Sequence, residues 1–194
     1  MDLQYFEKTI STKRIFEGNV INLRVDTIAL PDGKNATREV VEHRGGVCIL
    51  ALDKSHALDK DNALDEGHIL FVRQFRKPLE NELLEIPAGK LEKGEDHRNC
   101  ALRELKEETG YTAGRFEYLG GAYLSPGYSS ELIHMYFASD LTKGEACPDQ
   151  DEFLEVLRLP VETVMAQVAS NEIRDGKTLA AIAAAIAKGY ITLA

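Results

Sequence analysis

The stretch from residue 89 to residue 111, GKLEKGEDHRNCALRELKEETGY, constrains the fold of this chain more than any other segment. Residues 96–109 carry apolar side chains at helical spacing, and a glycine follows them where helices often end. Glu104, Glu107 and Glu108 are three or four residues apart, so this helix places three carboxylates on one face. The fold must therefore accommodate a helix with concentrated negative charge.

Carboxylates that share a helix face repel one another by roughly a few tenths of a kcal/mol for each pair. A divalent cation would turn that repulsion into binding, and oxygen ligands suit Mg²⁺ or Mn²⁺. Glu95 could add a further carboxylate, and Arg103 can either pair with Glu107 or brace the loop before the helix. Taken alone, the E-x-x-E-E pattern is also compatible with a solvated acidic helix face.

The wider spacing around this helix narrows the interpretation. Five residues separate Gly89 from Glu95, and seven more precede the run R-E-L-K-E-E-T-G that begins at Arg103. This arrangement matches every fixed position of the pattern G-x5-E-x7-R-E-U-x-E-E-x-G-U, with Tyr111 in a place that usually holds an aliphatic residue. The chain therefore resembles the Nudix hydrolases. The resemblance implies an α+β fold, an α/β/α sandwich with a mixed sheet between helices, and hydrolysis of a nucleoside diphosphate linked to another group.

Hydrophobic patterning predicts a small N-terminal antiparallel β module over residues 1–44, and the resemblance implies a Nudix domain over residues 45–194. A turn is expected at residues 31–33, and an elongated hairpin loop is expected over the period-six repeat at residues 51–66. The remaining expected strands cover residues 21–25, 37–43, 47–52, 69–75, 116–124, 132–138 and 153–159. Helices are expected over residues 96–109, 161–170 and 177–188.

Features outside the motif allow a finer comparison: Pro126 lies sixteen residues after Gly110, and further matching segments lie around residues 74–76, 84–89 and 151–156. Together they resemble one group of Nudix hydrolases, the ADP-ribose pyrophosphatases. The resemblance implies Mg²⁺-dependent hydrolysis of ADP-ribose to AMP and ribose 5-phosphate by water. Two alternatives stay open: hydrolysis of another nucleoside diphosphate derivative, such as a nucleotide sugar, reduced dinucleotide or dinucleoside polyphosphate, and a non-catalytic sensor that binds ADP-ribose.

The same resemblance implies roles for individual residues. The metals, two or three Mg²⁺ or Mn²⁺ ions, would be held by the Ala88 carbonyl, Glu104, Glu107 and Glu108. The catalytic set would comprise Glu104, Glu107, Glu108, Arg103 and the general base Glu152. Gln150 stands where some relatives carry a glutamate, so Asp149 and Asp151 stay alternative bases. Substrate contacts would come from Arg76, Glu85, Arg38, His43 and Glu131, with Pro126 shaping a loop.

The net charge and the cysteine content indicate which binding partners and which cellular location to expect. The formal net charge is −9, from 23 basic and 32 acidic residues, which disfavours nucleic acid and anionic membranes as partners. Three cysteines with no metal-binding spacing favour a reducing compartment. Neither a signal peptide nor a membrane span is expected, so the predicted location is cytoplasmic. The resemblance adds an expected homodimer that acts on a small nucleotide.

Overall fold

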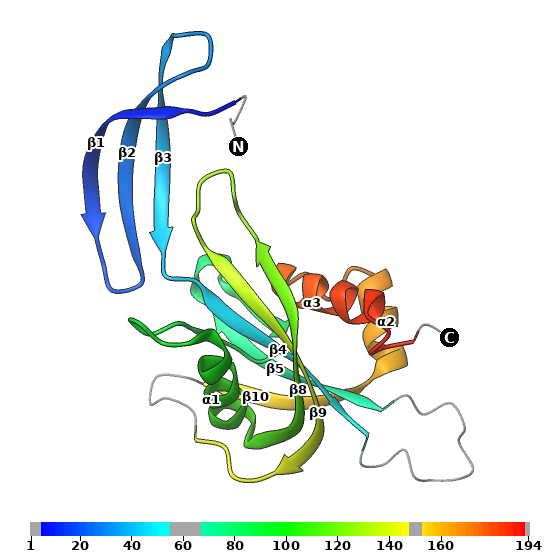
Figure 1. Cartoon of the computed structure of the whole chain (residues 1–194). Coiled ribbons are helices and arrows are strands. Elements are labelled where there is room, and N and C mark those ends of the chain that lie inside the picture. The colour runs from blue at the N-terminus through cyan, green and yellow to red at the C-terminus, as the bar shows by residue number, and fades with distance from the viewer. Residues whose placement is uncertain (1–4, 55–66, 148–152, 193–194) are drawn as a thin grey trace. The chain divides into compact units, whose positions relative to one another are not determined.

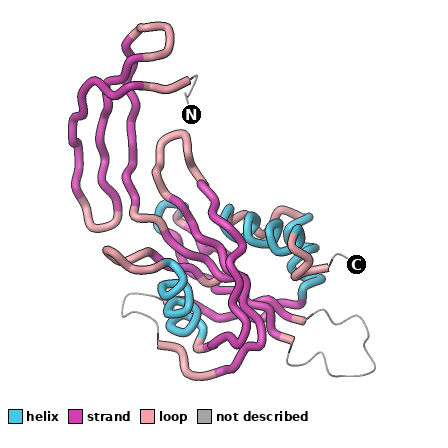
Figure 2. Tube along the Cα trace, in the orientation of Figure 1, coloured by secondary structure: helices cyan, strands magenta, loops and turns pink. Residues whose placement is uncertain are grey.

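The computed structural model describes residues 5–54, 67–147 and 153–192. The chain forms two compact units, and each is described by itself. The first comprises Met1–Gly45 together with Tyr123–Leu132, and the second comprises Gly46–Ala122 together with Ile133–Ala194. Gly45, at the junction, has a φ of 88°, a backbone conformation that glycine adopts without strain. Figures 1 and 2 trace the elements of both units.

The first unit is a three-stranded antiparallel sheet in the order β1-β2-β3. Its strands are β1 (Lys8–Glu17), β2 (Ile21–Ala29) and β3 (Asn35–His43). The predicted turn between β2 and β3 is confirmed: Gly33 has a φ of 86°, and its N–H donates to the Leu30 carbonyl at 2.9 Å. The segment at residues 123–132 joins this unit through Val41, whose N–H donates to the Tyr128 carbonyl at 2.7 Å.

The second unit contains a mixed sheet in the order β10-β5-β4-β9-β8, with β6 beside β5 and β7 beside β4. The pairing of β4 with β9 is parallel, whereas β4 and β5, and β5 and β10, are antiparallel. The strands are β4 (Gly46–Asp53), β5 (His68–Arg76), β6 (Asn81–Glu85), β7 (Ala88–Lys90), β8 (Tyr111–Tyr123), β9 (Leu132–Lys143) and β10 (Leu154–Pro160).

Helices cover both faces of this sheet (Figure 1). They are α1 (His97–Thr109), α2 (Val161–Ala169) and α3 (Gly176–Ala187), with a short 3₁₀ helix, η1 (Lys77–Leu79), after β5. Every residue of β4 is buried, and alternate side chains enter opposite cores. Val47 and Ile49 pack with residues of α1, whereas Cys48 and Leu50 pack with residues of α2 and α3. None of the described helices is long and apolar enough to cross a membrane.

The expected fold class is confirmed, because a mixed sheet lies between helices and a small antiparallel sheet is formed by the N-terminal residues. The three predicted helices are confirmed to within one residue at their ends. The strand predicted to begin at residue 116 is longer and begins at Tyr111, directly after α1. Three strands were not predicted: β1, which lies within the expected N-terminal β module, and β6 and β7, which are only five and three residues long. Residues 55–66 of the predicted hairpin loop lie outside the described residues.

Candidate active site

The register of the acidic face of α1 is fixed by caps at both helix ends. At the N-terminus, the Asp96 side chain accepts hydrogen bonds from the backbone N–H groups of Arg98 and Asn99, each at 3.1 Å. At the C-terminus, Gly110 adopts a φ of 77°, and its N–H donates to the Lys106 carbonyl at 2.8 Å. The three glutamates lie in the last two turns between these caps.

Two of the three glutamates are buried. Glu104 is 8% exposed and Glu108 is 2% exposed, whereas the side chain of Glu107 is 37% exposed. The N–H of Ala88, the first residue of β7, donates to Oε2 of Glu108 at 3.0 Å. The structure therefore brings together the four predicted metal-site residues on α1 and β7, with the Ala88 backbone directly beside a buried carboxylate.

Gly89 allows this close approach of β7 to α1. A Cβ atom added at Gly89 would overlap the carboxylate of Glu104, so only glycine fits without displacing that side chain. Strand β7 is also held in place by β4, because Val47 of β4 pairs with Gly89 of β7. The first glycine of the motif thus creates the space in which Glu104 lies.

Arg103 connects the glutamates with the loop before α1. Its guanidinium forms a bidentate pair with Glu95, with both N–O distances 3.1 Å, and it donates to Glu104 at 2.9 Å and to Glu107 at 2.8 Å. The hydrogen bond from Arg103 holds the pKa of the Glu95 carboxyl below its ordinary value. The two roles that the sequence left open for Arg103, pairing with Glu107 and bracing the loop, are both fulfilled.

The described residues contain no group of three or more His, Cys, Asp or Glu side chains already arranged around a single cation position. The glutamate oxygens of α1 are instead turned toward Arg103 and the Ala88 N–H. The donor set still fits a hard divalent cation, because two buried carboxylates, Glu104 and Glu108, lie against the backbone of Ala88 and Gly89 and offer oxygen ligands. A cation bound by Glu104 and Glu107 would have to draw these two carboxylates away from Arg103.

A second group of charges surrounds Glu85, the last residue of β6. Glu85 is fully buried and accepts a bidentate pair from Arg76, at 2.6 and 2.7 Å, as well as a hydrogen bond from Lys177. Burial would raise the pKa of the Glu85 carboxyl, but these two cations outweigh that effect and lower it. The Arg76 side chain is 40% exposed, and its pKa is raised mainly by Glu85 with a contribution from Glu108. Arg76 therefore lies within electrostatic reach of both Glu85 and the buried carboxylate Glu108 of α1.

The remaining predicted substrate residues that the structure describes belong to the first unit. His43 and Glu131 are adjacent, with His43 Nδ1 3.3 Å from Glu131 Oε1, and His43 Nδ1 also accepts the Gly45 N–H at 3.0 Å. Arg38 pairs with Glu7 and is not in a described contact with that histidine. Pro126 is exposed in a turn that the Ser125 carbonyl closes by accepting the Ser129 N–H at 2.9 Å.

Some of the predicted site residues lie outside the described part of the chain. In addition, the structure contains charged residues near the site that the sequence did not predict. The proposed base Glu152 and the neighbouring residues 149–151 lie outside the described residues. Lys177 and Thr178, at the start of α3, contact Glu85 and Ile86, and Asp175 contacts both of these α3 residues. The sequence predicted only a helix over residues 177–188 here and no site residue. Ninety-two residues separate Lys177 from Glu85, so no local spacing in the sequence could have paired them.

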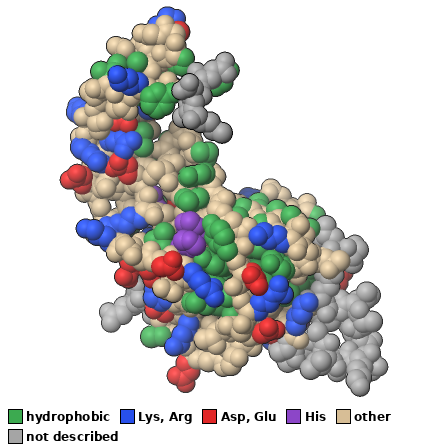
Figure 3. All heavy atoms as spheres, viewed as in Figure 1, with side chains coloured by type: hydrophobic (Ala, Val, Ile, Leu, Met, Phe, Trp, Pro, Cys, Tyr) green, Lys and Arg blue, Asp and Glu red, His purple; other side chains and the backbone are tan. Residues whose placement is uncertain are grey.

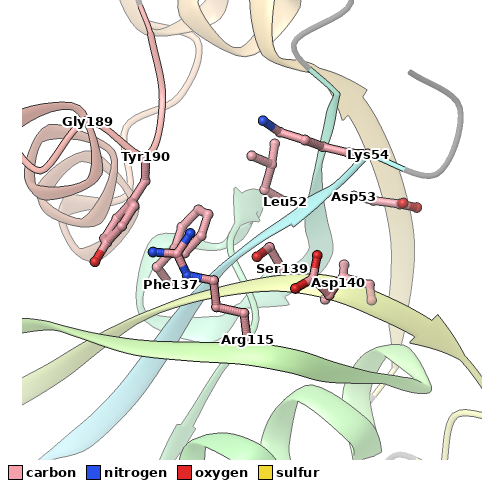
Figure 4. Close-up of a pocket in the computed structure, with 10 residues that line it drawn as sticks. Leu52, Asp53, Lys54, Arg115, Phe137, Ser139, Asp140, Gly189 and Tyr190 are labelled. Atoms are coloured by element: carbon pink, nitrogen blue, oxygen red, sulfur yellow. The ribbon is translucent and has the colours of Figure 1, made fainter. Parts of the chain in front are cut away.

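Neither the surface charge on the face shown in Figure 3 nor the cavity shown in Figure 4 marks the acidic face of α1. On the face shown in Figure 3, acidic and basic side chains are intermixed and do not gather into one large patch of a single sign. A cavity of about 480 Å³ is lined by Leu52 and Asp53, and Figure 4 shows Arg115 against the rings of Phe137 and Tyr190 in its wall. Because β7 pairs with the first residues of β4, this cavity lies at the opposite end of β4 from the glutamates.

Comparisons with known proteins agree with this geometry. Residues 60–182 match the NUDIX domain family, and residues 7–41 match the nucleoside diphosphate sugar hydrolase N-terminal domain. The ADP-ribose pyrophosphatase of Bacillus subtilis (strain 168) is 46% identical over 178 residues, which cover 91% of this chain and 90% of that protein. The methanol dehydrogenase activator of Bacillus methanolicus is 44% identical with the same coverage.

A solved structure described as an ADP compounds hydrolase shares the fold. It has a TM-score of 0.75 at 18% sequence identity, and the match covers 95% of this chain and 97% of that chain. The NUDIX match spans more than half of the chain and includes the buried glutamates of α1. On these grounds, the chain belongs to the Nudix hydrolase family.

Proposed function

We propose that this protein hydrolyses the diphosphate bond of ADP-ribose to AMP and ribose 5-phosphate, with Mg²⁺ as its cofactor. The observation that carries the proposal is the pair of buried carboxylates, Glu104 and Glu108, held against the Ala88–Gly89 backbone. The chain that holds them is 46% identical to an ADP-ribose pyrophosphatase along nearly its whole length. Nudix hydrolases generally need divalent metal ions, and this oxygen-rich donor set suits them.

In this mechanism, Glu104, Glu107, Glu108 and the Ala88 carbonyl would hold the two or three expected ions. Bound there, the ions would neutralise the diphosphate and lower the pKa of the attacking water. Arg103 would keep Glu104 and Glu107 in place before the ions bind, since it already donates to both. Glu152 stays the predicted base that takes a proton from the water, whose oxygen forms the new bond to phosphorus as the second phosphate leaves.

Substrate binding is proposed from position and from the family resemblance. Arg76 would bind the diphosphate, because it is a half-exposed cation within electrostatic reach of Glu108. Glu131 and His43, which are adjacent, and Arg38 would contact the nucleoside or sugar ends. Glu85 is fully buried, so its proposed effect on substrate would act through Arg76. We further propose a cytoplasmic homodimer in which residues 1–44 form the module that adjoins the partner.

A second candidate keeps the chemistry and changes the substrate. The match of residues 7–41 to the nucleoside diphosphate sugar hydrolase N-terminal domain favours a nucleotide sugar as an alternative substrate. Both substrates contain a nucleoside diphosphate joined to a sugar, so the α1 site would treat their diphosphates alike. Discrimination between them would depend on contacts with the base and the distal sugar, which the first unit is proposed to provide.

Mass-spectrometric product analysis tests the proposal. The purified protein is incubated with ADP-ribose, several nucleotide sugars, a reduced dinucleotide and a dinucleoside polyphosphate, each with Mg²⁺ and with chelator. We expect AMP and ribose 5-phosphate to form fastest from ADP-ribose and not to form with chelator. Faster cleavage of a nucleotide sugar would support the second candidate, and binding without cleavage would support a sensor.

A variant of the buried glutamate links the chemistry to α1. Glu108→Gln keeps the size of the side chain but removes the charge, so turnover should fall by about 100-fold or more. Glu117→Gln, an exposed substitution on β8, is the matched control and should retain activity. Circular dichroism of both variants checks the fold, and near-normal turnover of folded Glu108→Gln would refute the assignment of Glu108 to the metal site.

A further inference from the structure

The ion pair between Arg76 and Glu85 raises a question of charge balance. Glu85 is 0% exposed, and Arg76 occupies both of its carboxylate oxygens. If Arg76 turned toward an anionic diphosphate, it would leave a buried carboxylate behind. An uncompensated buried charge is strongly unfavourable, so the loss of this pairing would oppose substrate binding. A second cation beside Glu85 would reduce this cost.

Lys177 is that second cation. Its ammonium contacts Oε2 of Glu85 and lies 3.0 Å from Oδ1 of Asp175, and its side chain is only 11% exposed. Two cations and two carboxylates therefore form a neutral group around Glu85. Arg76 is the most exposed member at 40%, while the lysine and both carboxylates are at least about nine-tenths buried. The geometry leaves Arg76 accessible to a ligand and keeps Lys177 inside.

The start of α3 holds Lys177 rigidly in this position. Asp175 caps the helix, since it accepts hydrogen bonds from the Thr178 N–H at 3.1 Å and from the Thr178 hydroxyl at 2.6 Å. Oγ1 of Thr178 in turn accepts the Ile86 N–H at 3.0 Å, directly after Glu85 in the chain. The first turn of α3 is thereby fixed to the segment that leads to Ala88.

We propose that Lys177 is a positioning residue that holds Glu85 when Arg76 moves onto the substrate diphosphate. In this exchange, Arg76 gives up its bidentate pair with Glu85 and forms the corresponding pair with phosphate oxygens. Lys177 stays in place, so Glu85 remains paired throughout. No bond other than hydrogen bonds changes, and no proton is transferred. The inference rests on the proposed function, because it assigns Arg76 to the diphosphate of that substrate.

The test compares Lys177→Met with Lys177→Arg and with the double variant Lys177→Met/Glu85→Gln. In Lys177→Met, Glu85 has only Arg76 as a cation, so the KM for ADP-ribose should rise by about tenfold while kcat changes little. Lys177→Arg should keep a KM near that of the wild type. The double variant removes the carboxylate that would retain Arg76, so it should recover most of the affinity. Lys188→Met, at the other end of α3, is the matched control.

A second measurement separates this inference from the proposed function. Calorimetric titration with inorganic pyrophosphate at a fixed Mg²⁺ concentration reports the affinity for a diphosphate without turnover of ADP-ribose, and thermal unfolding reports the stability of each variant. Wild-type protein that binds pyrophosphate but does not cleave ADP-ribose would refute the proposed function alone. The inference is overturned if Lys177→Met binds pyrophosphate as the wild type does. It is also overturned if the double variant binds as weakly as Lys177→Met, or if the wild type does not bind pyrophosphate.

Discussion

Gly89 shows how a residue without a side chain determines the position of a charged one. Glu104 occupies the volume that a Cβ of residue 89 would need, so the carboxylate can be buried only beside a glycine. Gly94, in the loop between β7 and α1, is different: it has a φ of 81°, and a Cβ there would meet no atom within 4 Å. The two glycines therefore serve separate purposes, space at one position and backbone conformation at the other.

This difference predicts different effects for two alanine substitutions. Gly89→Ala should displace Glu104 and reduce turnover by about tenfold or more, since small errors in catalytic geometry are costly. Gly94→Ala should cost about 1 kcal/mol of folding stability through its left-handed backbone and leave turnover largely intact. Steady-state kinetics and denaturant unfolding of both variants check the prediction, which fails if Gly94→Ala loses more activity than Gly89→Ala.

Sequence and structure agree most closely at the residues of the motif. The fixed spacing predicted that the α1 glutamates share a face, and the helix places two of them in the interior beside Ala88. The spacing could not predict that Arg103 donates hydrogen bonds to both Glu104 and Glu107. Nor could it pair Lys177 with Glu85, because that contact depends on how α3 packs against β6 rather than on neighbouring residues.

At the scale of elements, α1 depends on its capping residue. Asp96 is the N-cap and accepts two backbone N–H groups, which would otherwise lack a partner in the first turn. Asp96→Ala should therefore reduce the free energy of unfolding by about 1 kcal/mol. Glu145→Ala, which removes an exposed carboxylate, is the control and should change it by less than about 0.5 kcal/mol. Urea denaturation measures both, and equal losses would contradict the capping role.

The first residue of α1 also joins a stack of rings with β8 and β9. His97 stacks on His134, with ring centroids 4.0 Å apart and an interplanar angle of 5°. Tyr136 hydrogen bonds to Nδ1 of His97 at 2.6 Å, and Tyr118 hydrogen bonds to Nδ1 of His134 at 3.0 Å. Burial and the neighbouring charge of His97 lower the pKa of His134 below its ordinary value, although Asp96 acts in the opposite direction. The stack therefore favours the neutral form of the His134 ring.

This lowered pKa predicts how stability depends on pH. The unfolded chain takes up a proton at His134 more readily than the folded protein, so this contribution to stability is complete above about pH 6.5 and is lost as the pH falls below that value. His134→Gln keeps a polar side chain that does not titrate, so its Tm should fall less than that of the wild type between about pH 7.5 and 5.5. Calorimetry across this range checks the prediction, and parallel Tm curves would contradict it.

Element boundaries were predictable where the sequence carries strong local signals. The helices end at caps such as Gly110 and were predicted to within a residue, since capping depends on neighbours in the chain. The strands β6 and β7 have no such signal, because three to five residues are too few to show a period. They form because β5 and β4 provide partners, and β7 carries Ala88 and Gly89 into the site.

At the scale of the whole molecule, the residues of the first unit that the structure describes form no buried hydrophobic cluster. In the three strands of its sheet only Asp26 and Ile28 are buried, and every residue of β1 is exposed. Small sheets typically need packing on one face in order to be stable. The first 21 residues nevertheless expose a set of large apolar side chains: Tyr5, Phe6, Ile10, Ile15, Phe16, Val20 and Ile21. Exposed apolar side chains at this density are typical of surfaces that bind another protein.

The irregular register of β1 indicates which part of that surface would be used. The pairing of β1 with β2 shifts between Thr9 and Ser11 and again between Arg14 and Phe16. Bulges of this kind discourage the addition of another strand at an edge. The two residues at the shifts, Ile10 and Ile15, are 54% and 48% exposed. The proposed homodimer would therefore form through side chains of the sheet rather than through continued strand pairing.

The double variant Ile10→Lys/Ile15→Lys tests this interface. Light scattering after size-exclusion chromatography should give the wild type twice the chain mass of 21.5 kDa, while the variant should shift toward the single-chain mass because two charges cannot be buried there without partners. Thr9→Lys/Ser11→Lys adds the same charge at exposed polar positions and should remain dimeric. A monomeric wild type would contradict the homodimer, and a variant that stays dimeric would place the interface away from β1. If the dimer also completes the nucleotide site, dissociation should raise the KM for ADP-ribose while thermal unfolding of the α1 unit is unchanged.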